Sequence, residues 1–172
     1  MKRILIFAVV SIFALADATA QDNIAFIDSR KILEAVPSYV TAQNEIDALA
    51  NQYQQTIQEE ISKIENLYNS YQASKATLPA SRRTAIENQI ISKENAVQQK
   101  QQLYFGEDGI IPKKSEQLLD PIRKKMDEVV ENEGKKGGYA MIIDIAASSG
   151  VAYYNADKDI SQTIINILNN QL

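Results

Sequence analysis

Residues 24–39, IAFIDSRKILEAVPSY, decide how the fold is built, because they open on a short strand that has no neighbouring strand in the sequence. The apolar run 24–27 is typical of a buried strand, and Asp28 stands where it can cap a short helix before Pro37. The long region that follows is rich in Gln, Glu, Asn and Lys at helical spacing. The partner of the opening strand must therefore lie near the other end of the chain.

The C-terminal region supplies candidate strands for this pairing. Two apolar runs, 139–145 and 151–154, flank a Ser-Ser-Gly turn, and this pattern predicts a β-hairpin that can accept residues 24–27 as a third strand. Asp159, with Gln162 at the capping-box position, predicts the start of a closing helix. The residues expected to build this sheet body are Ile24, Phe26, Ile27, Met141, Ile143, Ile145, Val151 and Tyr153.

A long helix is predicted to leave this body. Apolar residues recur at steps of three and four from Val40 to Tyr71, which places them on one face of a helix. The polar residues between them cannot build a broad core. Pro79, within the segment 77–81, stops this helix and reverses the chain. At 1.5 Å per residue the helix would extend roughly 55 Å, about twice the width of a small domain.

A second helix is predicted to return toward the body. Its apolar stripe is interrupted by FGEDG at 105–109, resumes near Pro112 and ends at Gly134 as a C-cap. A two-helix hairpin buries too little to be stable alone, so the body must anchor it. The predicted fold is therefore α+β, with a small β-sheet body and a long antiparallel α-helical coiled-coil hairpin inserted into it. The body would comprise residues 21–39 and 112–172, and the arm residues 40–111 with its tip near 77–81.

Residues 1–20 have the pattern of a secretory signal peptide. Lys2 and Arg3 give the positive start, an apolar run follows, and Ala18-Thr19-Ala20 is a small-x-small cleavage site. The apolar run is shorter than the roughly 20 residues of a transmembrane span. Cleavage is predicted after Ala20, although 14–16 (ALA) would also serve, and an uncleaved signal anchor is the alternative. The pattern predicts export across the inner membrane.

The composition excludes several function classes. The chain contains neither cysteine nor histidine, so zinc fingers and Ser-His or Cys-His catalysis lack their usual residues. The 18 basic and 22 acidic residues become a net charge of −5 once Lys2, Arg3 and Asp17 leave with the leader, which argues against nucleic-acid binding. We expect no enzyme activity, catalytic residues, metal or cofactor.

Two carboxylate patterns have a functional and a structural interpretation. Asp28 and Asp144 end two apolar runs and could form an acid/base dyad, but helix capping and a turn explain them better. The residues Asn155, Asp157 and Asp159 have the spacing of a calcium loop, yet the required glycine and glutamate are absent further along. The segment 134–138, GKKGG, lacks the Walker spacing and favours a helix cap with a turn.

The order of these segments resembles the Skp/OmpH family of periplasmic chaperones. The similarity rests on IAFIDSRKILEAVPSY near the start, the long helical excursion, LLDPIRKKMDEVVENEGKKGGYAMIID before the sheet and VAYYNADKDISQTIINIL at the end. The resemblance implies a homotrimer with a shared β-barrel body and three helical arms around a cavity. It further implies that unfolded outer-membrane β-barrel proteins are held there without ATP. A short sheet with open edges independently favours sharing among subunits.

The arms carry the candidate client-binding residues. Tyrosines of the arm could pack within the hairpin or face the cavity, where a ring with a hydrated hydroxyl suits weak contacts with unfolded chains. Near the tip the stretch 66–86 carries three basic and no acidic residues, which could steer an acidic client or an anionic membrane surface or could be incidental. The alternative function is a structural spacer or adaptor of the cell envelope. The candidate residues are Tyr53, Tyr68, Tyr71, Tyr104, Lys75, Arg82 and Arg83.

Overall fold

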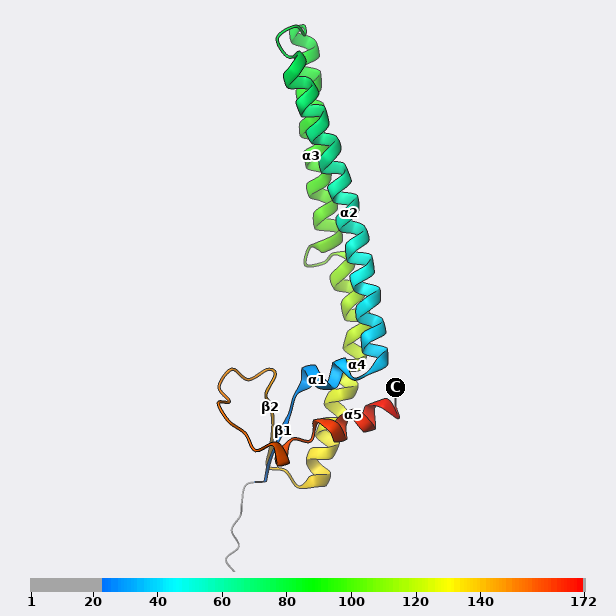
Figure 1. The fold of residues 1–172 in the computed structure, drawn as a ribbon. Coiled ribbons are helices and arrows are strands. Elements are labelled where there is room, and N and C mark those ends of the chain that lie inside the picture. The colour runs from blue at the N-terminus through cyan, green and yellow to red at the C-terminus, as the bar shows by residue number, and fades with distance from the viewer. Residues whose placement is uncertain (1–22, 172) are drawn as a thin grey trace, which may run out of the picture.

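A long helical arm projects from a small body in the computed structural model, which describes residues 23–171 (Figure 1). The predicted signal peptide, 1–20, lies outside the described residues. Across residues 23–171, no helix combines the length and the apolar character that a membrane span requires. The two ends of the described chain lie in the same body, at the foot of the arm. The arm is therefore an excursion from the body, as the sequence predicts.

Five α-helices, two strands and one 3-10 helix make up the described chain. In chain order they are β1 (Ile24–Ile27), α1 (Ser29–Glu34), α2 (Pro37–Ser74), α3 (Ala80–Phe105), α4 (Ile110–Gly137), β2 (Met141–Asp144), η1 (Ala156–Lys158) and α5 (Ser161–Asn169).

The opening strand pairs with the C-terminal region, as predicted, but the sheet is parallel and has two strands. Strand β1 lies beside β2 with Ile24 opposite Met141 and Ile27 opposite Asp144. Parallel strands need a long crossover, and α1 to α4 provide it. The helical arm is therefore the crossover connection of a small βαβ arrangement.

The predicted hairpin over 139–154 is wrong, because residues 151–154 form no strand. The third segment beside the sheet is 159–161, on the far edge of β1: the N–H of Ile160 donates to the carbonyl of Phe26 at 2.9 Å, and the N–H of Asp28 donates to Ser161 Oγ at 2.8 Å. After β2, the N–H of Ala146 donates to Asp144 Oδ1 at 3.0 Å, which turns the chain away from the sheet. The segment 151–154 consequently runs as a loop.

The core of the body lies between the sheet and four helices. Strand β1 and helix α1 contribute one buried side, while α4 and α5 contribute the apolar stripes opposite. The first turns of α2 belong to the same core, so the body is tied to the root of the arm. The buried members of this core are Ile27, Ile32, Val36, Ala42, Ile46, Leu119, Ile122, Met126, Val129, Ile164, Ile165 and Leu168.

The distal arm has its own narrow core. Helix α2 contributes Ile57, Ile64 and Tyr71, seven residues apart, and α3 contributes Ile90 and Val97 at the same spacing. One buried residue in every two turns gives a single seam, as the one-sided pattern predicts. The distal arm therefore exposes most of its circumference to solvent.

The ends of the helices correct two predicted caps. Helix α4 continues through Gly134 to Gly137, and Gly138, with a φ of +63°, forms its left-handed cap. Gly134 instead lets α4 pass close to β2, since a Cβ there would lie 3.3 Å from Ile142 Cδ1. At α5 the N-cap is Ile160, so Gln162 sits one position too early for a capping box and pairs with Asn166 at 3.0 Å.

Candidate functional site

The tip of the arm gathers the three predicted basic residues. Lys75 follows α2 directly, and Arg82 and Arg83 lie in the first turn of α3. The amino group of Lys75 lies 3.8 Å from Glu87 Oε1, so one of the three charges is compensated across the turn. Sequence reasoning missed Glu87 as a tip residue, although the antiparallel register of the hairpin places it opposite Tyr71. The guanidinium groups carry the remaining positive charge of the tip.

Tyr71 anchors the two helices just below the tip. Its ring is buried, its hydroxyl donates to Glu87 Oε1, and the Lys75 amino group lies 5.3 Å from the ring centroid. The hydrogen bond to Glu87 holds the proton on the phenol and raises the pKa of Tyr71, and burial of the ring adds to this effect. Tyr71 is thus a packing residue of the hairpin.

Raising the pH is expected to remove the contribution of Tyr71 to the stability of the tip. A tyrosine titrates near pH 10 when unperturbed, and the pKa of Tyr71 is raised in the folded arm. Its hydrogen bond therefore stabilises the fold below about pH 10 and is lost as the pH rises through the folded pKa. Thermal unfolding followed by circular dichroism should show a higher midpoint temperature for wild type than for Tyr71→Phe at about pH 8, and this difference should shrink as the pH rises through the folded pKa of Tyr71.

A tyrosine outside the seam provides the matched control for this experiment. Tyr68 is exposed, so Tyr68→Phe should follow the wild-type profile throughout the titration. An advantage of wild type over Tyr71→Phe that stayed constant from neutral to alkaline pH would show that the Tyr71–Glu87 bond does not support the tip.

A second aromatic cluster lies where the returning helix is interrupted. The rings of Tyr53 and Tyr104 stack at 4.0 Å with an interplanar angle of 5°, and Phe105 meets Tyr104 edge to face at 6.4 Å. The cluster joins α2 to the end of α3, immediately before the break at 106–109. Tyr53 and Tyr104 are therefore hairpin contacts, and Tyr68, which is 49% exposed, is the predicted arm tyrosine that offers the most surface.

An apolar groove lies on the arm between Tyr68 and the tip. We call it the tip groove; it is lined by Tyr68, Tyr71, Gln72, Lys75, Glu87, Ile90 and Ile91. Its floor contains the buried Tyr71 and Ile90, whereas Ile91 is 54% exposed. Sequence reasoning missed Ile91. Two adjacent isoleucines on a helix cannot both face the same partner, so the pair 90–91 itself indicates that one of them is exposed.

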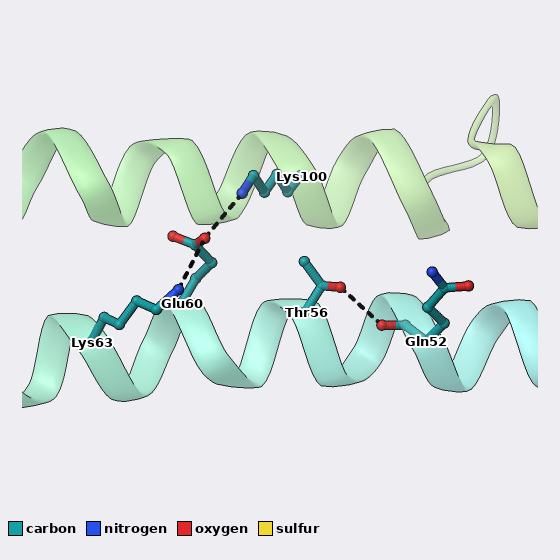
Figure 2. Close-up of polar contacts among 5 residues, drawn as sticks. All are labelled: Gln52, Thr56, Glu60, Lys63 and Lys100. Atoms are coloured by element: carbon teal, nitrogen blue, oxygen red, sulfur yellow. Dashed lines mark hydrogen bonds and ion pairs between the residues drawn. The ribbon is translucent and has the colours of Figure 1, made fainter.

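Ion pairs between the helices fix the register of the arm below the groove. Glu60 on α2 lies 3.4 Å from the amino group of Lys100 on α3 and 3.8 Å from that of Lys63 (Figure 2). The hydrogen bond and positive charge of Lys100 lower the pKa of the Glu60 carboxyl. Nearer the root, Glu45 pairs with Lys114 on α4 at 2.8 Å. These contacts are charged, so they orient the helices without adding apolar surface.

The predicted sheet residues range from buried to strongly exposed, and most of them are partly buried. Ile27 is buried, whereas Met141 and Tyr153 are 56% and 85% exposed. Phe26 contacts Tyr154, with ring centroids 5.2 Å apart. The partly buried members of the predicted set are Ile24, Phe26, Ile143, Ile145 and Val151. The single chain thus leaves apolar side chains of its sheet region uncovered.

Four of the five side chains considered as catalytic or calcium-binding groups accept hydrogen bonds from backbone N–H groups. Asp28 Oδ1 accepts from the N–H of Lys31 at 3.0 Å, which confirms that it caps α1, and Asp144 Oδ1 accepts from the N–H of Ser29 at 3.1 Å. Asn155 caps η1, and Asp159 Oδ1 accepts from the N–H of Ser161. Between residues 23 and 171, no three acidic side chains gather in a way that could hold a metal ion.

The fold and the site define a class of protein in which a small body carries a long, thin helical arm with apolar and charged surface near its tip. The model of the OmpH-like outer membrane protein family matches residues 23–168. The chain therefore belongs to the OmpH-like family, which is a family of chaperones and not a class of enzymes. The resemblance seen in the sequence is confirmed.

Individual relatives agree with this assignment. The chain is 25% identical over 166 residues to the chaperone protein Skp of Yersinia enterocolitica, covering 96% of this chain and 98% of that protein. Its fold is similar to the crystal structure of a putative OmpH-like outer membrane chaperone from Caulobacter crescentus CB15. That similarity has a TM-score of 0.66 at 15% identity, covering 87% of this chain and 85% of the other.

Proposed function

We propose that this protein is a periplasmic holdase that binds unfolded outer-membrane β-barrel proteins and prevents their aggregation without ATP. The observation that carries the proposal is the arm itself. Its distal part buries one narrow seam and exposes apolar side chains at Tyr68, Ile91, Leu103 and Phe105. A long surface of scattered apolar and charged groups favours many weak contacts, which suits unfolded chains of varied sequence.

The holdase acts as a homotrimer in this proposal. The exposed side chains of Met141 and Tyr153 support it, because apolar groups beside an open sheet edge are expected to be covered by another subunit. Three bodies would share the sheet region as a β-barrel, and three arms would surround a cavity. A client enclosed there cannot pair its strands with those of another client.

Neither ATP nor metal enters the proposed mechanism. Binding would be non-covalent and multivalent, and release would follow when the client folds or meets a partner that binds it more tightly. The tip residues Arg82 and Arg83 would steer acidic segments toward the arms. Salt at physiological strength screens this attraction beyond roughly 8–10 Å, so it weakens as salt is added.

Aggregation of unfolded clients tests the proposal. Two unrelated β-barrel proteins, unfolded in urea, are diluted into buffer with and without the purified protein, and light scattering is followed with no nucleotide present. A holdase keeps both clients in solution. If both clients aggregate as fast as in buffer alone, the arms have the role of an envelope spacer or adaptor and the proposal fails.

A further inference from the structure

The tip groove and a neighbouring hollow form one continuous track along the end of the arm. The neighbouring hollow is lined by Lys75, Ala80, Arg83, Thr84 and Glu87, and it shares Lys75 and Glu87 with the tip groove. The track therefore begins at the exposed Ile91 and ends at Arg83 beside the turn. Along α3 the span from residue 91 to residue 83 is about 12 Å at 1.5 Å per residue.

The two ends of the track differ in chemistry. At the lower end, Tyr68 and Ile91 present apolar surface over the buried Ile90. At the upper end, Glu87 is paired with Lys75 and accepts from the Tyr71 hydroxyl. The negative charge of Glu87 is compensated by Lys75, so the charge of Arg83 makes the upper end positive. An occupant that complements both ends must be apolar at one end and acidic at the other.

We propose that this track binds a five-residue segment of an unfolded polypeptide in extended conformation, with a bulky apolar side chain at one end and a carboxylate at the other. The first and fifth residues of an extended segment lie about 13 Å apart, at roughly 3.3 Å per residue, which matches the length of the track. Alternate side chains of an extended segment face the same way, so the first, third and fifth residues meet the track. The first lies against Tyr68 and Ile91, and the fifth reaches Arg83. This inference rests on the proposed holdase function and specifies what one arm selects.

Short labelled peptides test the track on the full-length protein. Fluorescence anisotropy compares GYTVTDG with GYTVTKG, in which lysine replaces the carboxylate, and with GSTSTDG, which lacks the apolar side chains. We expect the aspartate peptide to bind about threefold or more tightly than the lysine peptide at low salt, with the difference shrinking as salt is raised. The serine peptide should bind about tenfold more weakly, because it buries little apolar surface.

Matched variants locate the binding on the arm. Ile91→Gln and Arg83→Gln should each weaken binding of the aspartate peptide, whereas two controls should not. Val40→Gln removes an exposed apolar side chain at the root of the arm, and Lys124→Gln removes an exposed positive charge on α4; neither residue lines the two hollows. Equal losses in the controls would overturn the proposal, since binding would then be spread over the whole arm.

Further outcomes distinguish this inference from membrane binding and from the proposed holdase function. Binding to anionic phosphatidylglycerol vesicles, with none of the peptides bound, would overturn the track in favour of a membrane surface. If the peptides fail to bind while wild type still suppresses aggregation of full-length clients, the track is wrong and the holdase function stands. If aggregation is not suppressed either, the proposed function fails as well.

Discussion

Removing residues 54–103 is expected to abolish the suppression of client aggregation while leaving the body folded and self-associated. The deletion takes away the entire distal core, whose members all lie between residues 57 and 97. It retains Ala42 and Ile46, which belong to the core of the body, and the contact between Glu45 and Lys114. The shortened chain keeps the core of the body and loses the arm surface that would hold clients.

The geometry of the hairpin sets the design of this variant. Tyr53 and Tyr104 stack across the two helices, so the chain is rejoined there with a four-residue Gly/Asn loop that spans the 8–10 Å between packed helices. The control carries the same loop in place of residues 76–79 and keeps the arm. Circular dichroism and sedimentation equilibrium report folding and association. A shortened chain that holds clients as well as the control would show that the body, and not the arm, binds them.

Leu168→Ala is expected to destabilise the body by about 2–5 kcal/mol. Leu168 is fully buried on α5, in the same core as Ile32, Ile122 and Ile164. Truncation removes apolar contact and leaves a cavity that closely packed neighbours cannot fill. The loss is a large fraction of the roughly 5–15 kcal/mol that holds a typical domain.

Urea denaturation at one fixed protein concentration measures this effect, because association also contributes to apparent stability. Thr163→Ala changes an exposed residue of the same helix and should alter the free energy of unfolding by less than about 0.5 kcal/mol. If Leu168→Ala unfolded at the same urea concentration as this control, α5 would not belong to the core of the body.

The arm could be predicted from the sequence because its signals are local. Helical spacing can be recognised from neighbouring residues alone, and Pro79 interrupts the helix in any tertiary context. The turn between α2 and α3 and the break before α4 lie where the sequence places them. The opening strand could also be matched with 141–144, since few other apolar runs were available.

The arrangement of the body could not be predicted in the same way. The run 151–154 has strand-like composition, but a hairpin needs the chain to double back along β2, and the hydrogen bond from the N–H of Ala146 to Asp144 Oδ1 turns it away from the sheet instead. Composition does not record which backbone groups are already paired. Gly134 misled for a related reason: glycine can cap a helix or permit close packing, and only the position of β2 decides between them.

The positions of the candidate site residues could be predicted in part. Lys75, Arg82 and Arg83 lie at the tip as the reversal at Pro79 requires, whereas the roles of the tyrosines depend on which side of each helix faces the partner. Tyr71 is buried in the seam, whereas Tyr68, three residues earlier on the same helix, is exposed. Glu87 and Ile91 became visible only with the register between α2 and α3.

The mass of the soluble client complex tests the central claim, that three arms enclose an unfolded β-barrel protein without ATP, most directly. A urea-unfolded client is diluted into an excess of the protein with no nucleotide, and the complex is measured by light scattering coupled to size-exclusion chromatography. We predict a single species whose mass equals three copies of this chain and one client. A client that aggregates, or a soluble mixture with no fixed ratio of three chains to one client, would contradict the claim.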